Sequence, residues 1–485
     1  MSLLDGELVI DNFAGGGGAS TGIEAAIGRP VDIAINHSPE AIAMHAANHP
    51  RTKHYCENIW EVDPREACGS RPVGLLWASP DCTHFSRAKG GQPRSREVRA
   101  LAHVVIRWAR AVRPRTILLE NVEEFQTWGP LDENGFPIKA REGEDFRAWL
   151  AELTDCGYDV SFRTLVAADY GAPTTRKRLF LVAQRRGAAP IVWPEPTHGK
   201  GRPRPWRTAA EIIDWSLPCP SIFGRKKPLA EATQRRIAAG LRRFVIESAQ
   251  PFIVPVKSWG GGGNGPRGLA EPMRTVTTSK RGEFALVTPY LMTNTSGHPG
   301  RALGAPVPTV TTGDHHYLMA PTLVQTGYGE RAGQRPRALD IEHPLGTVVS
   351  GGKHALVAAF LAKHYGTSHG GPHPGVPVDA ALGTVTARDH HSVVEVHTVT
   401  TKARFGLVTI AGEDYAIADI GMRMLSPREL FNAQGFPGDY RIDIDFEGKP
   451  LTKTAQIELA GNSVCPDAAE ALVRENALPA RRRVA

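Results

Sequence analysis

The stretch LVIDNFAGGGGAST, residues 8–21, decides the fold class. Its first five residues form a short apolar run, four consecutive glycines follow, and a helix is expected after them. Such a turn lets the backbone approach a ligand closely and leaves amides free at a helix start. A tight connection between a strand and a helix would have the same sequence. The turn alone therefore does not distinguish a ligand-binding turn from a plain connection.

Four further apolar runs and two segments with helical spacing extend this pattern. The runs are VDIAIN (31–36), GLLWAS (74–79), TILLEN (116–121) and LFLVAQ (179–184), and the helical segments are 97–112 and 145–153. Strands buried on both faces and alternating with helices predict a doubly wound, mostly parallel α/β sheet. Ligands of such sheets bind beyond the carboxyl ends of the strands, so the residues after each run are the candidates for chemistry.

Length and composition set outer limits on the function. The chain has 485 residues and a formal net charge of +7, which predicts two or three globular domains and permits a polyanionic partner. Its six cysteines are scattered without a C-x-x-C pair, and no apolar run approaches 18 residues. We therefore expect a cytoplasmic protein without a membrane span, a secretion signal or a bound metal.

The middle of the chain is rich in proline and glycine and contains an internal repeat. Thr-Val pairs recur at Thr275, Thr309, Thr347 and Thr384, in steps of 34, 38 and 37 residues. Each pair precedes a polar turn and a second apolar run, which predicts four β-hairpins. The expected organisation is a catalytic domain (1–190), a β-rich target-recognition region (191–420) with repeats near 265–396, a C-terminal segment that returns to the catalytic domain (421–475) and a basic tail (476–485).

Three groups of residues follow predicted strands and carry reactive side chains. Cys82 lies in SPDCTHFS (79–86), Glu120 closes the run 116–121, and Arg176 and Arg178 precede the last run. A lone cysteine is more often an inert core residue, but cations downstream and a strand-end position favour a thiolate. The two arginines would face the same way in an extended backbone.

In this order the motifs resemble the DNA cytosine-5 methyltransferase family, which has the S-adenosylmethionine-dependent methyltransferase fold. The matching blocks are Phe13 to Gly18, Pro80 to Ser86, Glu120-Asn121-Val122, Arg176 to Arg178, the segment 423–437 and GNSVCP (461–466). They cover about half of the chain. The interval between the arginines and the segment 423–437 is the family's target-recognition region, so the repeats are expected to read DNA.

The resemblance implies a mechanism and a set of site residues. Cys82 would add to C6 of a flipped-out cytosine, Glu120 would bond its protonated N3, Arg178 would orient both, with Arg176 a second candidate, and C5 would take the methyl group of S-adenosylmethionine. The implied cofactor contacts are Phe13, Ala14, Gly15, Gly16, Gly17, Gly18, Asn36, His37, Asn58, Ile59, Pro80, Asn462, Ser463 and Val464. The predicted DNA contacts are Ser86, Arg87, Lys89, Arg94 and Arg96. The basic stretch from Arg87 to Arg96 is either a mobile lid whose cations contact phosphates or an ordinary solvated loop.

Several positions depart from the family pattern. Asn36 and Asn58 stand where carboxylates usually meet the ribose and the adenine of the cofactor, so hydrogen bonding there lacks charge assistance. Asp81 replaces a proline before the nucleophile, Thr83 and Thr174 replace glutamines, and Cys465 replaces a proline. Cofactor affinity is the property that these departures affect most.

The same residues bear on alternative functions. A nicotinamide enzyme is disfavoured because Asn36 and His37 stand where a carboxylate is expected, and a zinc deaminase because Pro80-Asp81-Cys82 lacks its second cysteine. The pairs His315-His316 and His390-His391 are not shared by the other repeats, so no common metal site is expected. The same chemistry on RNA, and a DNA-binding relative that has lost catalysis, stay open.

The expected partner is double-stranded DNA. We expect a monomer of bacterial or phage origin, associated with the nucleoid, and the resemblance allows a cognate restriction enzyme.

Overall fold

The N-terminal part of the chain folds around a seven-stranded sheet of order β3-β2-β1-β4-β5-β8-β6. The computed structural model describes residues 6–81, 101–214, 216–217, 222, 226–229, 237 and 423–478, and the backbone of strands between 252 and 422. All neighbouring strands of the sheet are parallel except β8, which runs antiparallel to both β5 and β6. The strands are β1 (Leu8–Asn12), β2 (Ile33–Asn36), β3 (Lys53–Cys56), β4 (Val73–Ala78), β5 (Thr116–Asn121), β6 (Tyr158–Val166) and β8 (Lys177–Arg185).

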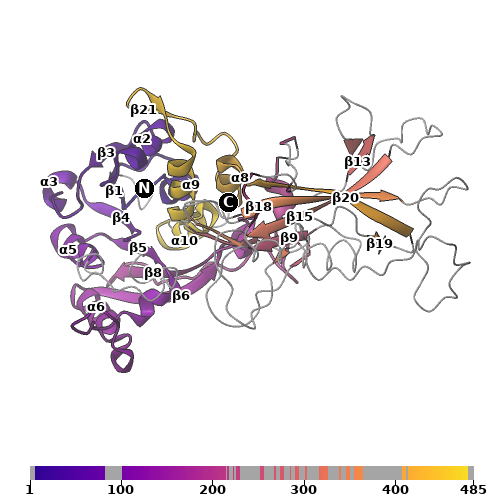
Figure 1. Ribbon diagram of the computed structural model, residues 1–485. Helices are drawn as coiled ribbons and strands as arrows, with labels where there is room; N and C mark the ends of the chain where they lie inside the picture. The colour runs from indigo at the N-terminus through magenta and orange to yellow at the C-terminus, as the bar shows by residue number, and fades with distance from the viewer. Residues whose placement is uncertain are drawn as a thin grey trace, which may run out of the picture.

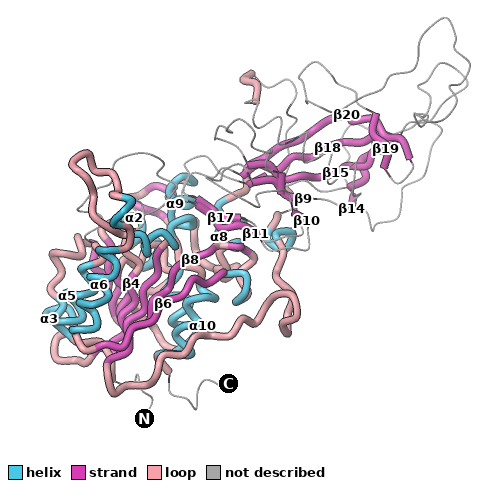
Figure 2. The backbone as a smooth tube through the Cα atoms, turned by 90° about the horizontal axis from the view of Figure 1, so that it is seen from below, coloured by secondary structure: helices cyan, strands magenta, loops and turns pink. Residues whose placement is uncertain are grey.

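Helices cover both faces of this sheet and bury two separate apolar clusters. One cluster packs α5 (His103–Val112) and α6 (Glu144–Asp155) on one face, and the other packs α1 (Gly18–Ile27) and α10 (Pro466–Asn476) on the opposite face. Figure 2 shows α5 and α6 on one side of β4 and β6, and α10 on the other. The predicted fold class, a doubly wound and mostly parallel sheet, is confirmed. The other helices near this sheet are α2 (Pro39–Asn48), α3 (Pro64–Cys68) and the 3-10 helices η2 (Glu123–Thr127), η3 (Lys139–Arg141), η4 (Ala167–Tyr170) and η5 (Ala209–Ile212).

The predicted strands agree with the structure to within two residues. Strands β3 and β6 were missed, and both lie at edges of the sheet, where side chains are partly exposed and no continuous apolar run is needed. The helix expected over 97–112 begins at His103 among the described residues.

The C-terminal segment packs against the N-terminal helix. It contains α8 (Pro427–Ala433), α9 (Lys453–Asn462) and α10, which Figure 1 draws in yellow beside the indigo strands. The capping box at Ser426 and Glu429, with Pro427 at the first helical position, starts α8. A Cβ atom on Gly22 of α1 would overlap the carbonyl oxygen of Pro466, so α1 and α10 approach each other closely because of this glycine.

The middle of the chain forms further strands, of which only the backbone is described. They are β9 (Phe252–Pro255), β10 (Arg267–Gly268), β11 (Met273–Thr277), β12 (Phe284–Ala285), β13 (Tyr290–Thr293), β14 (Arg301–Ala302), β15 (His316–Gln325), β16 (Ala338–Leu339), β17 (Gly346–Val349), β18 (His354–Lys363), β19 (Leu407–Ile410) and β20 (Glu413–Met424). A ten-stranded sheet contains β15, β18 and β20, while β11 lies between β17 and the short β7 (Thr174–Thr175) of the N-terminal part. Two strands, β21 (Asp445–Phe446) and β22 (Lys449–Pro450), form a separate ribbon.

The prediction of a hairpin within each repeat was wrong for the first and third repeats. Strand β11 pairs in parallel with β17, not with β12, and β12 pairs with β9. Paired residues of β11 and β17, such as Arg274 and Gly346, lie 72 positions apart, which is the spacing of the first and third Thr-Val pairs. Equivalent runs of two repeats therefore pair with each other. The pairs at Thr309 and Thr384 lie outside the described residues, as do the side chains of the histidine pairs and residues 479–485 of the tail.

Within the part of the chain that the structure describes, no helix combines the length and apolar character needed to cross a bilayer.

Candidate active site

The candidate site residues gather where the parallel strands of the seven-stranded sheet end. The glycine-rich turn follows β1, Asn36 ends β2, Pro80 follows β4, and Glu120 and Asn121 end β5. The amide of Ser79 donates to the carbonyl oxygen of Asn12, so the ends of β1 and β4 stay joined beyond the strands. This edge is the position at which sheets of this class bind ligands.

Glu120 and Arg178 form a buried ion pair at this edge. Arg178 Nε lies 3.1 Å from Glu120 Oε1, and the Glu120 side chain is 9% exposed. Burial raises the pKa of Glu120, while the neighbouring Arg178 and Arg176 oppose that rise. The result is a carboxyl group that is easier to protonate than a surface glutamate but held in one orientation by a fixed cation.

Arg176 has a different partner from Arg178, although the two are separated by one residue. Its Nη1 donates to the carbonyl oxygen of Gly461 at 3.0 Å, and the residue is 3% exposed. Arg176 lies between β7 and β8, while Arg178 belongs to β8. Arg176 therefore connects this edge to the last turn of α9.

Asn121 fixes the turn that leads to the predicted nucleophile. Its Nδ2 donates to the carbonyl oxygen of Pro80 at 3.1 Å, and its Oδ1 accepts from the amide of Val122. Sequence analysis assigned Asn121 no role, because its partner lies 41 positions earlier. Asp81 is the last described residue here. Cys82 and the predicted lid residues Ser86, Arg87, Lys89, Arg94 and Arg96 lie outside the described residues.

The glycines of the turn after β1 serve different purposes. Phe13 and Gly15 have φ angles of 64° and 52°, so the chain reverses through left-handed backbone immediately after the strand. Gly17 also has positive φ, and a Cβ there would overlap the hydroxyl of Tyr440, while a Cβ on Gly18 would overlap the carbonyl oxygen of Val464. Close packing on the C-terminal segment thus accounts for Gly17 and Gly18, and Gly15 shapes the turn itself.

The other predicted cofactor residues of the C-terminal segment lie beside this turn. Ser463 is buried and donates through Oγ to the carbonyl oxygen of Leu459, and Val464 is buried against α1. Asn462 is exposed.

The two asparagines that replace carboxylates both form local turns. Asn36 Oδ1 accepts from the amide of Ser38 at 2.8 Å, and Asn58 Oδ1 accepts from the amide of Trp60 at 3.1 Å. What each side chain then offers a ligand is mainly its NH2 group, a donor. His37 is exposed between them, and Ile59 is buried in the core cluster.

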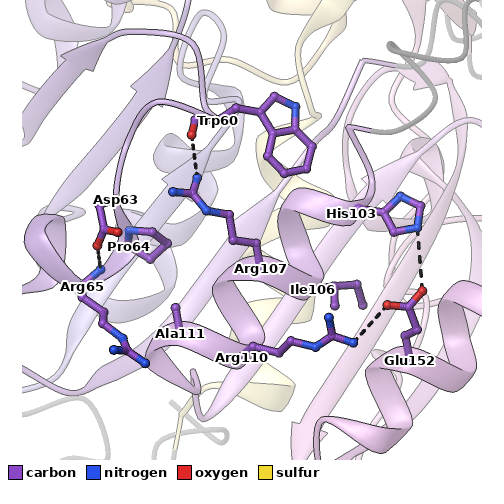
Figure 3. A pocket seen from close by; sticks show the side chains of 10 residues that line it. All are labelled: Trp60, Asp63, Pro64, Arg65, His103, Ile106, Arg107, Arg110, Ala111 and Glu152. Atoms are coloured by element: carbon purple, nitrogen blue, oxygen red, sulfur yellow. Dashed lines mark hydrogen bonds and ion pairs between the residues drawn. The ribbon is translucent and has the colours of Figure 1, made fainter.

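An arginine on α5 supports the second of these turns. Arg107 Nη1 donates to the carbonyl oxygen of Trp60 at 3.0 Å, as Figure 3 shows. The same figure shows an open pocket between α3, α5 and α6, where Arg110 bonds Glu152. This pocket lies on the helical face of the sheet and not at its carboxyl edge.

A buried acid beneath the turn was not singled out from the sequence. Asp11 is fully buried, its Oδ2 accepts from Ser20 Oγ at 2.7 Å, and its Oδ1 has no partner. Burial raises the pKa of Asp11 to about 7. An acidic residue inside an otherwise apolar strand was the available signal. Ser20 Oγ also lies 2.9 Å from His45 Nε2, and the ring of His45 contacts His54. Asp11, whose Oδ1 is unpaired, is therefore the end of a chain of polar contacts.

The edge offers what a nucleoside-bearing cofactor needs. An unpaired buried oxygen at the end of β1, an amide donor at the end of β2 and left-handed turn backbone lie together there. These groups fit S-adenosylmethionine.

Comparison with known proteins shows which family and which relatives this chain is similar to. The family model described as C-5 cytosine-specific DNA methylase matches residues 8–203 and 380–477, more than half of the chain. The chain is 31% identical over 214 residues to Type II methyltransferase M.SacI of Streptomyces achromogenes, covering 39% of this chain and 50% of that protein. For Type II methyltransferase M.XorII of Xanthomonas oryzae the identity is 29% over 195 residues, covering 39% and 43%. For Type II methyltransferase M.AquIA of Picosynechococcus it is 30% over 206 residues, covering 39% and 77%.

The matched region spans about half the length of the first two relatives. The ranges matched by the family model include the glycine-rich turn, Glu120, both arginines and the helices α8 to α10. The chain belongs to the C-5 cytosine-specific DNA methylase family.

Proposed function

We propose that this protein is a DNA cytosine-5 methyltransferase that modifies C5 of a cytosine flipped out of a specific duplex sequence. The observation that carries the proposal is the buried pair of Glu120 and Arg178, beside an asparagine that fixes the carbonyl of Pro80 two residues before Cys82. A carboxyl group easily protonated by burial suits a ring nitrogen, and the thiol of Cys82 is the nucleophile that we propose attacks the same ring.

The residues then divide the chemistry between them. The thiolate of Cys82 adds to C6 of cytosine while Glu120 shares a proton with N3, so the negative charge developing on the ring is neutralised. The resulting enamine is nucleophilic at C5. S-adenosylmethionine, when bound, supplies the methyl group that C5 takes. A base then removes the C5 proton, and Cys82 leaves as the C6–S bond breaks.

Positioning falls to groups around this pair. Arg178 fixes the orientation of Glu120, and Arg176 holds the last turn of α9 against the same edge. The cofactor would be held by the turn from Phe13 to Gly18 with Asp11 beneath it, and by Asn36 and Asn58. Ile59, Pro80 and Val464 supply apolar contact, because all three are buried at or near the same edge.

The proposed reaction also indicates the binding partner and the roles of the remaining parts of the chain. A cytosine inside a stacked duplex is out of reach of these atoms, so it must be extruded at a cost of about a few kcal/mol. We propose that double-stranded DNA lies over the carboxyl edge, that residues 191–420 read its sequence, and that Arg87, Lys89, Arg94 and Arg96 close over it. The protein would act as a cytoplasmic monomer of bacterial or phage origin, with or without a cognate restriction enzyme.

Expression in a host that lacks cytosine methylation tests the proposal. Bisulfite sequencing of host DNA should show 5-methylcytosine at one sequence context for the wild-type protein, and none for Cys82→Ala or Glu120→Gln. Cys156→Ala is the matched control, because this free cysteine follows α6 away from the carboxyl edge, and it should retain methylation. Absence of 5-methylcytosine from DNA, or its appearance in host RNA alone, would overturn the proposal.

A further inference from the structure

A basic loop leaves the seven-stranded sheet before the second sheet begins. It has the sequence THGKGRPRPWR, residues 197–207, with four cationic side chains that are all exposed and no acidic residue. These residues belong to none of the motifs used above. We call residues 197–207 the basic loop.

The basic loop is closed by its own backbone. The amide of Gly199 donates to the carbonyl oxygen of Arg204 at 2.8 Å, and the amide of Arg204 donates back to Thr197 at 3.3 Å. Prolines on both sides of Arg204 fix its neighbours' φ angles, and Gly199 has a φ of +129° that other residues rarely adopt. Little conformational entropy is therefore left to lose when the loop binds a partner.

One acidic residue anchors the basic loop to the sheet. The carbonyl oxygen of Asp169 accepts from the amides of Thr197 and His198 at 2.9 and 3.0 Å. Its carboxylate Oδ1 accepts from Trp206 Nε1 at 2.9 Å, and Gly199 packs so closely that a Cβ there would lie 3.0 Å from the same indole nitrogen. Both ends of the loop are thus attached to one residue.

That anchor places the basic loop at the carboxyl edge. Asp169 belongs to η4, which follows β6 directly, and Leu165 near the end of β6 is in register with Arg178. Arg178 in turn contacts Glu120. The cations therefore lie beside the edge at which the target base must be presented.

The charges of the basic loop are largely available. Arg207 is paired with Glu211 at 3.0 Å, whereas Arg202 lies 3.8 Å from Glu195, which is 88% exposed and so a weak partner. No carboxylate among the described residues pairs with Lys200 or Arg204. Burial lowers the pKa of His198, and Arg204 and Arg207 lower it further, as expected in a positive local field.

We propose that Lys200, Arg202 and Arg204 bind phosphates of the DNA duplex next to the target cytosine, outside the recognition repeats and the predicted lid. This inference rests on the proposed function. Exposed cations on a loop closed by its own backbone suit a regularly charged polyanion, and contacts with phosphates hold a duplex in position without reading its sequence.

Salt dependence of DNA binding tests the inference, with a charge-matched control. The test variant is Arg202→Gln with Arg204→Gln. The control is Arg65→Gln with Arg110→Gln on the helical face of Figure 3, where Arg110, like Arg202, has one carboxylate neighbour. Dissociation constants for a labelled mixed-sequence duplex of about 30 base pairs are measured by anisotropy between about 50 and 200 mM salt, with thermal melting to check folding.

For the test variant, the slope of log affinity against log salt should fall by roughly 1.8, about 0.9 for each phosphate that the variant no longer neutralises, and affinity at the lowest salt should drop at least about tenfold. The control should match the wild type. Trp206→Phe keeps every charge but removes the bond to Asp169, so it should weaken binding several-fold with a smaller change of slope.

Each outcome bears on one claim. If the test variant keeps the wild-type slope while the wild-type protein binds and methylates DNA, the inference is wrong and the proposed function stands. The inference is also wrong if the control variant lowers the slope as much as the test variant does. A wild-type protein that fails to methylate DNA in the bisulfite experiment contradicts the proposed function itself.

Discussion

Arg178 Nε lies 3.1 Å from Glu120 Oε1, in an environment where the two side chains are 15% and 9% exposed. Burial and the arginine act on the carboxyl group in opposite directions, since burial raises its pKa and Arg178 lowers it. Neutral cytosine carries no proton on N3, so the shared proton of the proposed mechanism enters with Glu120. The protonation state of this one group should therefore be visible in the rate of methylation.

Arg178→Ala tests this coupling. Removing Arg178 takes away the larger of the two charges that oppose burial, and Arg176 remains, so the pKa of Glu120 rises further and its protonated form persists to higher pH. The alkaline limb of the profile of kcat/KM against pH should move to higher pH, while kcat falls on the order of 100-fold because the carboxyl group loses its orientation. Lys177→Ala, whose partner is Glu123, is the control. An alkaline limb that stays in place or moves to lower pH contradicts the assignment.

Gly17→Ala and Gly15→Ala separate packing from turn shape. Both glycines have positive φ, but only a Cβ at Gly17 would overlap Tyr440. Gly17→Ala should lose on the order of 3 kcal/mol of unfolding free energy, and Gly15→Ala about 1 kcal/mol. Urea unfolding of both variants measures the difference. Equal losses would mean that the close approach of Tyr440 is not the reason why position 17 requires glycine.

Asn36→Asp should tighten cofactor binding. Aspartate preserves an oxygen for the amide of Ser38 and adds a charged acceptor for a ribose hydroxyl. The dissociation constant of S-adenosylhomocysteine, measured by calorimetry, should fall by roughly fivefold, about 1 kcal/mol. Asn134→Asp, on an exposed turn, adds the same charge elsewhere and should change nothing. Weaker binding by Asn36→Asp would remove this residue from the ribose site.

Asp467→Asn should change how stability depends on pH. Burial raises the pKa of Asp467 from 3.8 to about 7, and its Oδ2 has no partner. The folded protein therefore holds a proton that the unfolded chain releases, so stability from this group is complete below pH 4 and is lost as pH rises through 7. The asparagine variant should have an unfolding free energy higher than that of the wild type at pH 8, by on the order of 1–2 kcal/mol. At pH 5 the difference between the two proteins should be smaller.

Chemical unfolding at the two pH values checks this prediction. Asp439→Asn, an exposed change in the same C-terminal segment, should show no such difference. A destabilised Asp467→Asn at pH 8 would show that the carboxylate has a partner that compensates for its burial.

How far the sequence predicts the molecule depends on where the partner of each residue lies. Strands β1, β4, β5 and β8 are buried on both faces, so their continuous apolar runs are visible in the sequence, whereas the edge strands β3 and β6 are not. Glu120 was found because it ends such a run. The partner of Arg176, Gly461, lies 285 positions away, and no local pattern reveals such a contact.

The repeats show the same limit. Their spacing was visible in the sequence, but the hairpin prediction failed for the first and third repeats because β11 pairs with the equivalent run of a distant repeat, and side-chain pattern does not choose between near and distant partners. The roles of Cys82 and of the predicted cofactor and DNA contacts stay predictions.

Trapping of a covalent intermediate tests the central claim most directly. The wild-type protein is incubated with S-adenosylmethionine and a mixed-sequence duplex in which 5-fluorocytosine replaces cytosine, because fluorine at C5 cannot leave as the proton does. Mass spectrometry of the digested protein should find the modified base, with its new methyl group, on the peptide that contains Cys82, and should find none for Cys82→Ala. Abundant 5-methylcytosine on normal DNA without any adduct at Cys82 would contradict the account.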